Sequence, residues 1–457
     1  MKSALNYFEE IMNIPRESGK EEKIAQYLID YAKENNLEYH LGKYNTVFLR
    51  KNNNSNKTII LQAHSDMVCV STNNYDFDNK GIPFYIDGDY YRARNTSLGA
   101  DDGIGVAIIL AILQEHENMP NIEVIITTQE ETTMLGAMNF DYSQITGKTL
   151  ISLDGIKEAD IESSSAGMCS ITLNKNISYS SAKNNTYKLS IKGLMGGHSG
   201  DDIDKNRCNA IKLITSILKS LKCTQISNIE IGTRDNVIPS EGCVIFSSEY
   251  DPDTLKRKIA NLKFDLSKED SDFYYNVETI NSRDVIEQSE EVVNLLNDLK
   301  NGLLETYSYD GFPLLSSNIG KVSIENDIVT IKYSIRSSDK SKEEELINKT
   351  KKIAEKYGFE LVIDSLKPFF PFKEKSMIRE LLSESYKDLY GKDTTIKKIH
   401  ACIEGGILSS NIQDLDICTI APTIKNCHSV NENVSISSTE RVYEWLKDTL
   451  IRFNNQD

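Results

Sequence analysis

The sequence lacks any run that approaches the roughly 18 consecutive apolar residues of a membrane-spanning helix. Its first ten residues carry two glutamates and no apolar stretch, which is not the pattern of a secretion signal. The eight cysteines form no CxxC pair, and their spacing does not suggest a disulfide framework. We therefore expect a cytoplasmic protein with no membrane partner and with reduced, mostly buried thiols. The cysteines are Cys69, Cys169, Cys208, Cys223, Cys243, Cys402, Cys418 and Cys427.

Positive charge is also scarce, because 52 lysines and arginines stand against 68 aspartates and glutamates, for a net charge of −16. A nucleic-acid partner needs a basic surface, so the composition argues against one. The acidic surplus remains compatible with a site that collects metal cations. A length of 457 residues, of which 39% are hydrophobic, predicts at least two domains with cores of their own.

The N-terminal third has the pattern of an α/β sheet. Apolar residues at helical spacing predict two opening helices and, later, one strongly apolar helix. Between them lie strands whose apolar residues are nearly continuous rather than alternating, which is typical of strands covered on both faces. The helices are expected at 4–12, 19–35 and 103–113, and the strands at 46–49, 58–63, 122–127 and 148–153.

From about residue 184 apolar and polar residues alternate, which indicates a sheet with one face in water. We read 184–370 as an inserted, lid-like α+β domain, with 1–183 and 371–457 as the two segments of one α/β domain that has a mixed sheet and helices on both faces. The expected helices lie at 208–221, 292–304, 343–357 and 377–390, and further strands at 243–249 and 328–335.

Histidine and carboxylate side chains follow the predicted strands of the first domain. His64 and Asp66 come directly after the strand that ends at Ala63, and Asp154 follows the strand that ends at Leu153. The pair Glu130-Glu131 follows the strand at 122–127, and Asp101 lies just before the apolar helix; in open α/β sheets, ligands bind at this edge. We expect the side chains to converge there on one crevice.

These residue types suit two divalent cations. Imidazole and carboxylate ligands favour zinc, manganese or cobalt. The two oxygens of Asp101 can bridge ions about 3.5–4 Å apart. His64 and Asp154 would then complete one site, and Glu131 with a late histidine the other, while the neighbouring glutamate points at the attacking water. Asp66 would hydrogen-bond the far ring nitrogen of His64.

Each motif alone also has an ordinary structural explanation. Asp101 would cap a helix, Glu130-Glu131 would form a solvated turn, and Asp154 before a glycine is a common turn signal. Their joint position at strand ends favours the metal site. The residues alone choose neither between the two glutamates nor between His400 and His428 as the late histidine. For His400 two interpretations fit the sequence equally well: a residue of the active-site wall, or a hydrogen-bonded structural histidine. His40 and His116 are expected at the surface.

The chain resembles the M20 metallopeptidases, and within them the branch of aminoacyl-histidine dipeptidases, also called Xaa-His or cytosol non-specific dipeptidases. The segments that carry the resemblance run in order along nearly the whole chain. They are 7–16, 62–68 (QAHSDMV), 96–105 (TSLGADDGIG), 128–131 (TQEE), 193–200 (GLMGGHSG), 235–239 (DNVIP), 335–338 (IRSS), 400–406 (HACIEGG) and 421–429.

The resemblance implies a zinc-exopeptidase-like catalytic domain, an inserted lid that also forms a homodimer, and a role for each matching residue. One metal would be bound by His64, Asp101 and Asp154, and the other by Asp101, Glu131 and His428. The catalytic residues would be Glu130, as general base, and Asp66, which orients His64. The lid would bind the substrate through His198, Asn236 and Arg336.

The function expected from the resemblance is hydrolysis of dipeptides, of the Xaa-His type with broad specificity. A metal-bridging water would attack the peptide carbonyl after Glu130 takes its proton. Two alternatives remain open: an N-acyl-amino-acid deacylase or tripeptidase of the same superfamily, and a binding protein that has lost catalysis.

Overall fold

The chain forms two compact units in the computed structural model, which describes residues 2–222, 225–281 and 283–456. Unit 1 comprises residues 1–165, 370–398 and 404–457, and unit 2 comprises residues 166–369 and 399–403. Unit 2 is therefore an insertion into unit 1, and it begins earlier than the expected boundary at 183/184. Strand β9 (Gly167–Asn176) explains the difference, because it pairs with strands of unit 2 on both of its edges. The lid and dimerisation roles expected of the inserted segment stay predictions.

Unit 1 is built on a mixed eight-stranded sheet in the order β1-β2-β6-β3-β7-β23-β8-β22. Its central strands β6, β3, β7 and β23 are mutually parallel, and β1 and β2 run antiparallel at one side. The expected α/β class with a mixed sheet is confirmed. The strand bounds are β1 Glu38–Leu41, β2 Val47–Lys51, β3 Thr58–His64, β6 Asn121–Thr127, β7 Thr149–Ser152, β8 Asp160–Ser165, β22 Thr395–Ile399 and β23 Asp416–Thr419.

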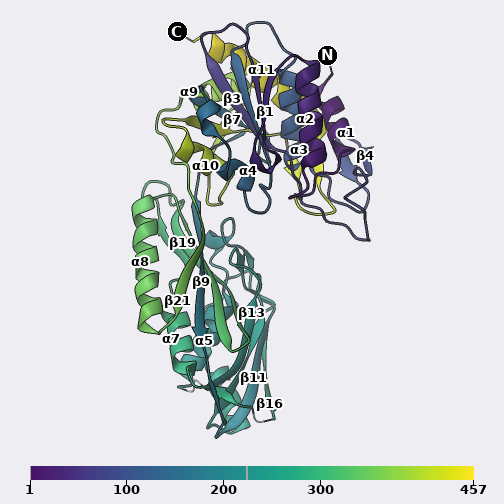
Figure 1. The fold of residues 1–457 in the computed structure, drawn as a ribbon. Coiled ribbons are helices and arrows are strands. Elements are labelled where there is room, and N and C mark those ends of the chain that lie inside the picture. Colours follow the sequence, from purple (N-terminus) through teal and green to yellow (C-terminus); the bar gives the residue numbers. More distant parts are fainter. Residues whose placement is uncertain (1, 223–224, 282, 457) are drawn as a thin grey trace. The chain divides into compact units, whose positions relative to one another are not determined.

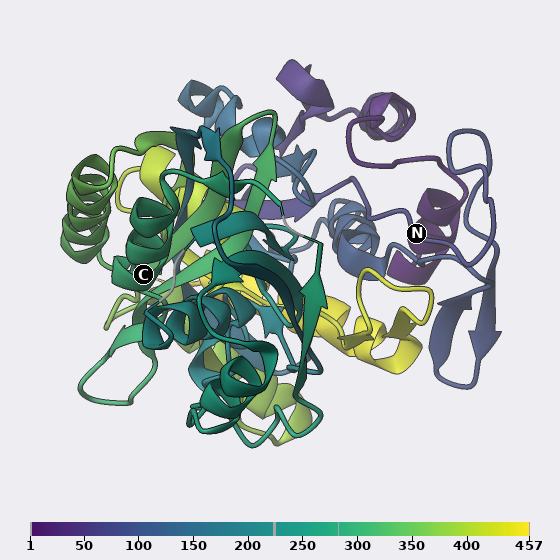
Figure 2. The same cartoon turned by 90° about the horizontal axis from the view of Figure 1, so that it is seen from below.

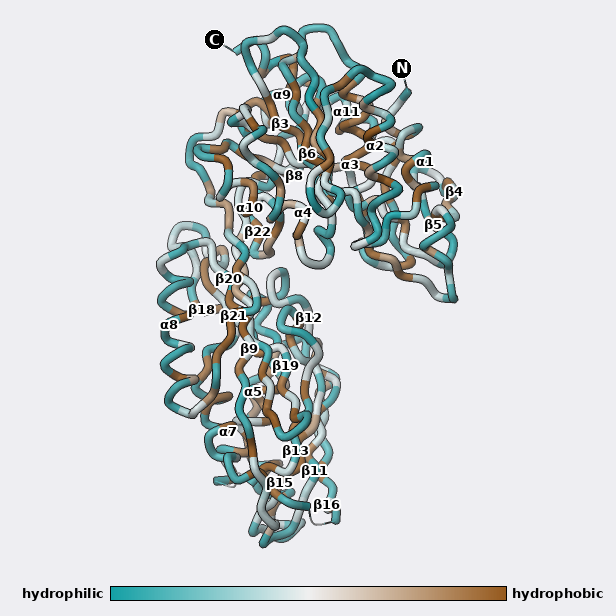
Figure 3. The backbone as a smooth tube through the Cα atoms, viewed as in Figure 1, coloured by the Kyte–Doolittle hydropathy of each residue, from teal (hydrophilic) through white to brown (hydrophobic). Residues whose placement is uncertain are grey.

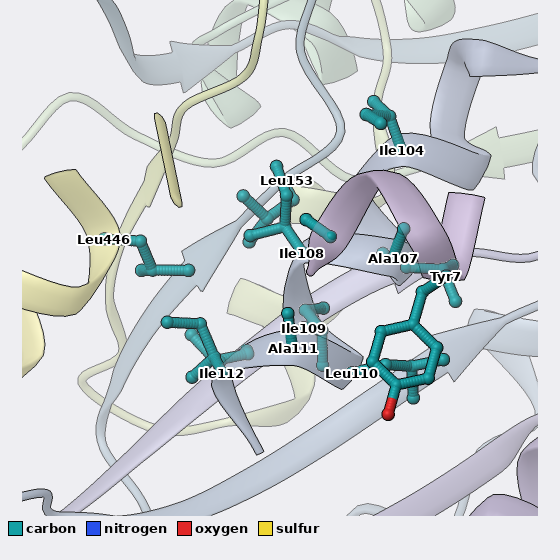
Figure 4. Packing of buried hydrophobic residues seen from close by; sticks show 14 of the residues in the cluster. Tyr7, Ile104, Ala107, Ile108, Ile109, Leu110, Ala111, Ile112, Leu153 and Leu446 are labelled. Carbon is teal, nitrogen blue, oxygen red and sulfur yellow. The ribbon is translucent and has the colours of Figure 1, made fainter. Parts of the chain in front are cut away.

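Helix α3 (Ala100–Ile112) lies at the centre of the unit 1 core, and of its residues only Asp101 is not buried. The residues from Gly103 to Ile112 are all apolar or glycine and all buried, and Figure 3 colours the helix by this hydropathy. Figure 4 shows Ile108, Ile109 and Ile112 in one cluster with Tyr7 and Leu446 from two other helices. The other helices of unit 1 are α1 Ala4–Met12, α2 Glu22–Glu34, α4 Leu135–Met138, α9 Met377–Tyr390, α10 Glu404–Asn411 and α11 Ile436–Asn454.

A second, four-stranded sheet in unit 1 has the order β24-β25-β5-β4. Its middle pair joins β25, from the end of the chain, to β5, which lies shortly before α3. This pairing brings the loop before β25 next to the loop before α3. The bounds are β4 Phe84–Asp87, β5 Tyr90–Ala93, β24 Ile424–Lys425 and β25 Asn433–Ser435.

Unit 2 is an antiparallel sheet in the order β16-β11-β15-β13-β19-β20-β9-β21, with β18 paired to β19. Helices α5, α7 and α8 contact this sheet (Figure 1 and, from below, Figure 2). The strand bounds are β11 Asn185–Lys192, β13 Gln225–Gly232, β15 Gly242–Ser248, β16 Tyr274–Ile280, β18 Gly302–Thr306, β19 Pro313–Glu325, β20 Ile328–Ser337 and β21 Glu360–Lys367. The helices are α5 Ala210–Ser220, α6 Pro252–Ala260, α7 Ser289–Asp298 and α8 Lys340–Lys356.

Two sequence expectations need correction. The helix expected at 292–304 is α7, which ends at Asp298, because the ψ of 132° at Leu299 is extended, and residues 302–304 belong to strand β18 instead. The expectation of mostly buried thiols is also wrong, because among the cysteines of the described residues only Cys169 and Cys418 are buried. The described cysteines form no disulfide. Cys223 lies outside the described residues.

Among the described helices, none combines the length and the apolar character that a membrane span needs.

Candidate metal centre

Three neighbouring parallel strands deliver ligand-type side chains to one edge of the unit 1 sheet. His64 is the last residue of β3, and it lies opposite Thr127, the last residue of β6. Glu130 and Glu131 follow β6 after a short turn, and Asp154 follows β7. The expected strand ends therefore meet because β6, β3 and β7 are adjacent and run in the same direction.

Asp101 reaches the same place from the start of α3. Its φ and ψ of −80° and 109° are not helical, so its carboxylate turns away from the helix axis. One oxygen, Oδ1, lies 3.2 Å from Nε2 of His64, and the other, Oδ2, lies 3.3 Å from Nε2 of His428. Asp101 is thus shared between two histidines from distant parts of the chain.

The side chains form two ligand groups that share Asp101. In each group one potential ligand atom per residue lies within 4.8 Å of the others. Nε2 of His64 is 3.6 Å from Oδ1 of Asp154, and Nε2 of His428 is 2.8 Å from Oε1 of Glu131. Two ligands of one tetrahedral zinc lie about 3.3 Å apart when each bond is about 2.0–2.2 Å. The groups are His64, Asp101 and Asp154, and Asp101, Glu131 and His428.

Glu130 belongs to a third, overlapping group with His64 and Glu131. Of the two glutamates, Glu131 makes the close contact with His428. Both backbone amides are fixed by Asp66, whose carboxylate accepts from Glu130 N at 3.1 Å and from Glu131 N at 3.3 Å. Oδ1 of Asp66 also lies 3.4 Å from Nδ1 of His64, so one buried aspartate contacts the histidine ring and both glutamate amides.

Burial and neighbouring carboxylates both raise the pKa of acidic groups in the cluster. Burial raises the pKa of Glu130 well above its ordinary value, and the charges of Glu131, Glu404 and Asp101 add to the increase. Burial, together with Glu130, Asp101 and Glu404, likewise raises the pKa of Asp154. Several carboxylates in one buried place repel each other unless positive charge is supplied.

The two histidines respond in the opposite way. Although burial opposes the change, Asp154, Asp101 and Asp66 raise the pKa of His64 well above 6.5. Hydrogen bonds with Asp101 and Glu131 raise the pKa of His428 to about 10. The cluster therefore attracts cations, and its imidazole and carboxylate atoms are the ligands that zinc and similar divalent ions prefer. The donor set and its spacing fit a pair of such ions.

The remaining predicted site residues lie together in unit 2. Arg336, at the end of β20, donates from Nε to Oγ of Ser199 at 3.3 Å, and its Nη2 lies 3.3 Å from Nε2 of His198. The backbone at Asn236 is joined to the same loop, because Ser199 N donates to its carbonyl oxygen at 2.9 Å. The structure thus brings the three predicted lid residues into one cluster around a buried guanidinium.

His400 belongs to this second cluster and not to the first. Its Nε2 lies 2.7 Å from Oγ of Ser316, and burial together with the charge of Arg336 lowers the pKa of His400 to about 3. It is therefore a neutral, hydrogen-bonded histidine. His40 and His116 are exposed, as expected.

Three buried residues at the metal centre were assigned no role from the sequence. The carboxylate of Glu404 accepts from Nε2 of Gln62 at 2.9 Å and from Oγ1 of Thr127 at 2.5 Å, and it thereby contacts the ends of β3 and β6. The other two are Arg16 and Glu432. In the sequence only Glu404 stands out, as a charged residue between an isoleucine and a glycine, whereas Arg16 and Glu432 each have a polar neighbour.

The comparisons with known proteins agree on one family. Residues 60–452 match the family model of peptidase family M20/M25/M40. The cytosol non-specific dipeptidase of Escherichia coli (strain K12) is 30% identical over 465 residues, which cover 97% of this chain and 96% of that protein. The crystal structure of aminoacylhistidine dipeptidase from Vibrio alginolyticus has a TM-score of 0.86 at 29% identity, with 98% and 96% of the two chains covered.

A tripeptidase from Staphylococcus aureus shares the fold at greater distance. Its TM-score is 0.63 at 15% identity, over 99% of this chain and 98% of that chain.

Proposed function

The chain belongs to peptidase family M20/M25/M40, and from this premise we propose that it is a metal-dependent dipeptidase. The chain matches the Escherichia coli dipeptidase and the Vibrio alginolyticus aminoacylhistidine dipeptidase over nearly their full lengths. The match therefore includes both of its units. We extend the proposal to a broad specificity that includes Xaa-His dipeptides.

One observation carries the proposal: the two oxygens of Asp101 each face a different histidine, and each histidine lies beside a further carboxylate. This is the arrangement that a carboxylate bridging two divalent ions requires. Two bound cations would supply electrophilic activation of the peptide carbonyl and would lower the pKa of water. We assign His64 and Asp154 to one ion, Glu131 and His428 to the other, and Asp101 to both.

Glu130 is the general base in this proposal. It lies in the cluster without the close histidine contact that Glu131 makes, so its carboxylate is available for proton transfer. Glu130 takes a proton from the attacking water and returns it to the nitrogen of the leaving amine. Asp66 keeps His64 and the Glu130 backbone in place for this step.

Unit 2 provides the groups that recognise the substrate. The planar guanidinium of Arg336 suits the free carboxylate of a short peptide, since it can donate two parallel hydrogen bonds. His198 carries a ring nitrogen beside Arg336 and would polarise the scissile carbonyl. Asn236 would add an amide to the same recognition. A carboxylate read in this way limits the length of the peptide that fits.

Three further points complete the proposal. Zinc is the metal that the donor set favours, with manganese and cobalt as the alternatives. Unit 2 forms the contact of a homodimer. The protein works in the cytoplasm, where its cysteines stay reduced.

The direct test is hydrolysis of a dipeptide panel by the purified chain, stripped with a chelator and then supplied with zinc, manganese or cobalt. We expect activity on dipeptides to vanish on stripping and to return with metal, at about two ions per chain by elemental analysis. Faster cleavage of N-acetylated amino acids or tripeptides than of any dipeptide would contradict the substrate class. A chain that binds no metal and cleaves nothing would be a binding protein instead.

A further inference from the structure

Glu432 makes an unusual set of contacts beside the metal centre. Its Oε2 accepts from the backbone amides of Leu98 and Gly99 at 2.8 and 2.9 Å, and its Oε1 accepts from the amides of Ala100 and Asp101 at 2.8 and 3.3 Å. The carboxylate is buried, with 3% of its residue surface exposed. One side chain therefore fixes four consecutive amides that lead into the shared ligand Asp101.

The position of Glu432 connects two ligand loops. Glu432 follows His428 by four residues, and its own amide donates to the carbonyl oxygen of Ser429 at 3.1 Å. Directly after it begins β25, which is paired with β5 ahead of the Asp101 loop. The carboxylate thus ties the loop that carries His428 to the loop that carries Asp101, and these two residues are 3.3 Å apart at their side chains.

Arg16 fixes the same loop from its other face. Its guanidinium donates to the carbonyl oxygen of Gly99, and through Nη1 to the carbonyl oxygens of Ser65 and Asp66 at 3.1 and 3.2 Å. Gly99 has a φ of +72°, and a β-carbon at this position would lie 2.4 Å from Nη2 of Arg16. The loop is consequently held between a buried carboxylate and a buried guanidinium, with no room for a side chain at Gly99.

We propose that Glu432 is a positioning residue that sets the Asp101 and His428 loops in their ligand geometry before any cation binds. This inference rests on the proposed function, since it concerns the affinity for the two cations. Glutamine at this position keeps the length of the side chain but replaces one carboxylate oxygen with an NH2 group. This group is a donor and cannot accept hydrogen bonds from the backbone amides. The loop then loses about half of its acceptors, and the ion shared by Asp101, Glu131 and His428 loses its preformed site.

The test compares Glu432→Gln with a matched control, Glu123→Gln. Glu123 is a fully buried carboxylate of the same unit that accepts from the backbone amides of Thr146 and Gly147, but it lies in β6 well before the ligand end of that strand. Zinc affinity is measured by competition with a chromophoric chelator, and apo-protein stability by thermal unfolding. We expect both variants to lose stability. Only Glu432→Gln should require at least tenfold more free zinc to fill the site of Asp101, Glu131 and His428.

Unchanged affinity of Glu432→Gln for both ions would overturn the positioning role, whereas a wild-type chain that binds no zinc would overturn the proposed function instead. Hydrogen exchange on the wild type covers the case in which Glu432→Gln does not fold. In the metal-free protein the amides of residues 98–101 should exchange no faster than the amides of β3 and β6 in the same unit. Rapid exchange of these amides without zinc would show that the loop is not set in advance, which contradicts the proposal.

Discussion

Each of the two units contains a cluster of ionisable side chains, and the clusters differ in charge and in construction. The cluster of unit 1 is acidic and is built from the ends of parallel strands, with ligand atoms less than 4 Å apart. The cluster of unit 2 surrounds one arginine and is built from strands and loops of an antiparallel sheet. The first suits cations and the second suits an anionic group of a substrate.

The contrast teaches where each kind of chemistry is placed in a fold. Parallel neighbours end at the same edge, so residues far apart in sequence become adjacent without long side chains. An antiparallel sheet distributes its strand ends over both edges, and a recognition site there depends on long side chains and loops. Catalytic geometry and substrate recognition can then be changed separately, which the following experiments exploit.

The largest expected effect separates catalysis from metal binding within unit 1. Glu130→Gln should lower kcat by about 10³-fold or more, since general base catalysis contributes roughly 10²–10⁴-fold and the neutral amide cannot accept the proton. Metal content should remain near two per chain. Glu131→Gln is the matched control, because it should instead lose metal from the group that contains His428. Loss of metal in Glu130→Gln, or a normal kcat, would contradict the role assigned to Glu130.

Metal removal should affect the two units unequally. Ions bound far above their dissociation constants stabilise a folded state by roughly 3–4 kcal/mol, and both proposed ions lie in unit 1. Backbone amides of β3, β6 and β7 should therefore exchange hydrogen faster in the metal-free protein, while amides of β13, β15 and β19 should keep their rates. Mass spectrometry of peptide fragments can measure both sets in one sample. Equal acceleration in both sheets would break the distinction between the units.

Arg336 tests recognition in unit 2. Arg336→Met should lower kcat/KM for a free dipeptide by about 100-fold, because a hydrogen bond to a charged group contributes roughly 1.5–3 kcal/mol. The rate for the C-terminally amidated dipeptide, already low, should hardly change. Arg257→Met is a suitable control, since Arg257 is exposed on α6 and its side chain donates to Asp253 and Thr254 of the same helix. A parallel loss on both substrates would refute the carboxylate contact.

The smallest effect concerns the stability of unit 2 at different pH values. Burial raises the pKa of Glu343, in α8, to about 7 from an ordinary value of 4.5. As the pH rises, the unfolded chain releases this proton near pH 4.5, whereas the folded chain keeps it until about pH 7. The free energy of unfolding therefore falls between about pH 4.5 and 7 and then stays level. Glu343→Gln should remove this slope and gain roughly 1–2 kcal/mol at pH 8 relative to pH 5.

Urea unfolding at several pH values measures this change. Glu355, an exposed glutamate of the same helix, serves as the control, and Glu355→Gln should keep the wild-type slope. A slope that persists in Glu343→Gln would assign the pH dependence to another group.

The sequence patterns predicted several elements correctly in both units, among them α5, α8, β15 and β20 of unit 2. The nearly continuous apolar strands at 58–63 and 122–127 and the helix at 377–390 are confirmed with small shifts of their ends. The family resemblance and the α/β class are confirmed as well. In unit 2, β9 was overlooked, although Cys169, Ile171 and Leu173 alternate as a strand requires, because serine, threonine and asparagine stand between and after them.

The candidate site divides in a similar way. The positions of the strand ends in the sequence predicted that His64, Glu130, Glu131 and Asp154 meet at one edge of the sheet. The structure places these residues in overlapping groups whose potential ligand atoms lie within 4.8 Å of one another. The choice of His428 over His400 needed the resemblance, since a contact over more than 300 residues leaves no local pattern. For the same reason nothing in the sequence marks Glu432, whose four partners are more than 300 residues away. The chemical roles of these residues stay predictions.

Asp101 has a thermodynamic consequence because it is common to both ligand groups. If Asp101 holds both ions as proposed, the first ion would orient its carboxylate and present the second oxygen to the other position, and a coupling free energy would link the two loading equilibria. The linkage is reciprocal: whichever ion enters first changes the affinity for the next by the same factor. A zinc titration of the wild type should accordingly deviate from two independent hyperbolas, and the activity should follow the doubly loaded fraction rather than the total metal.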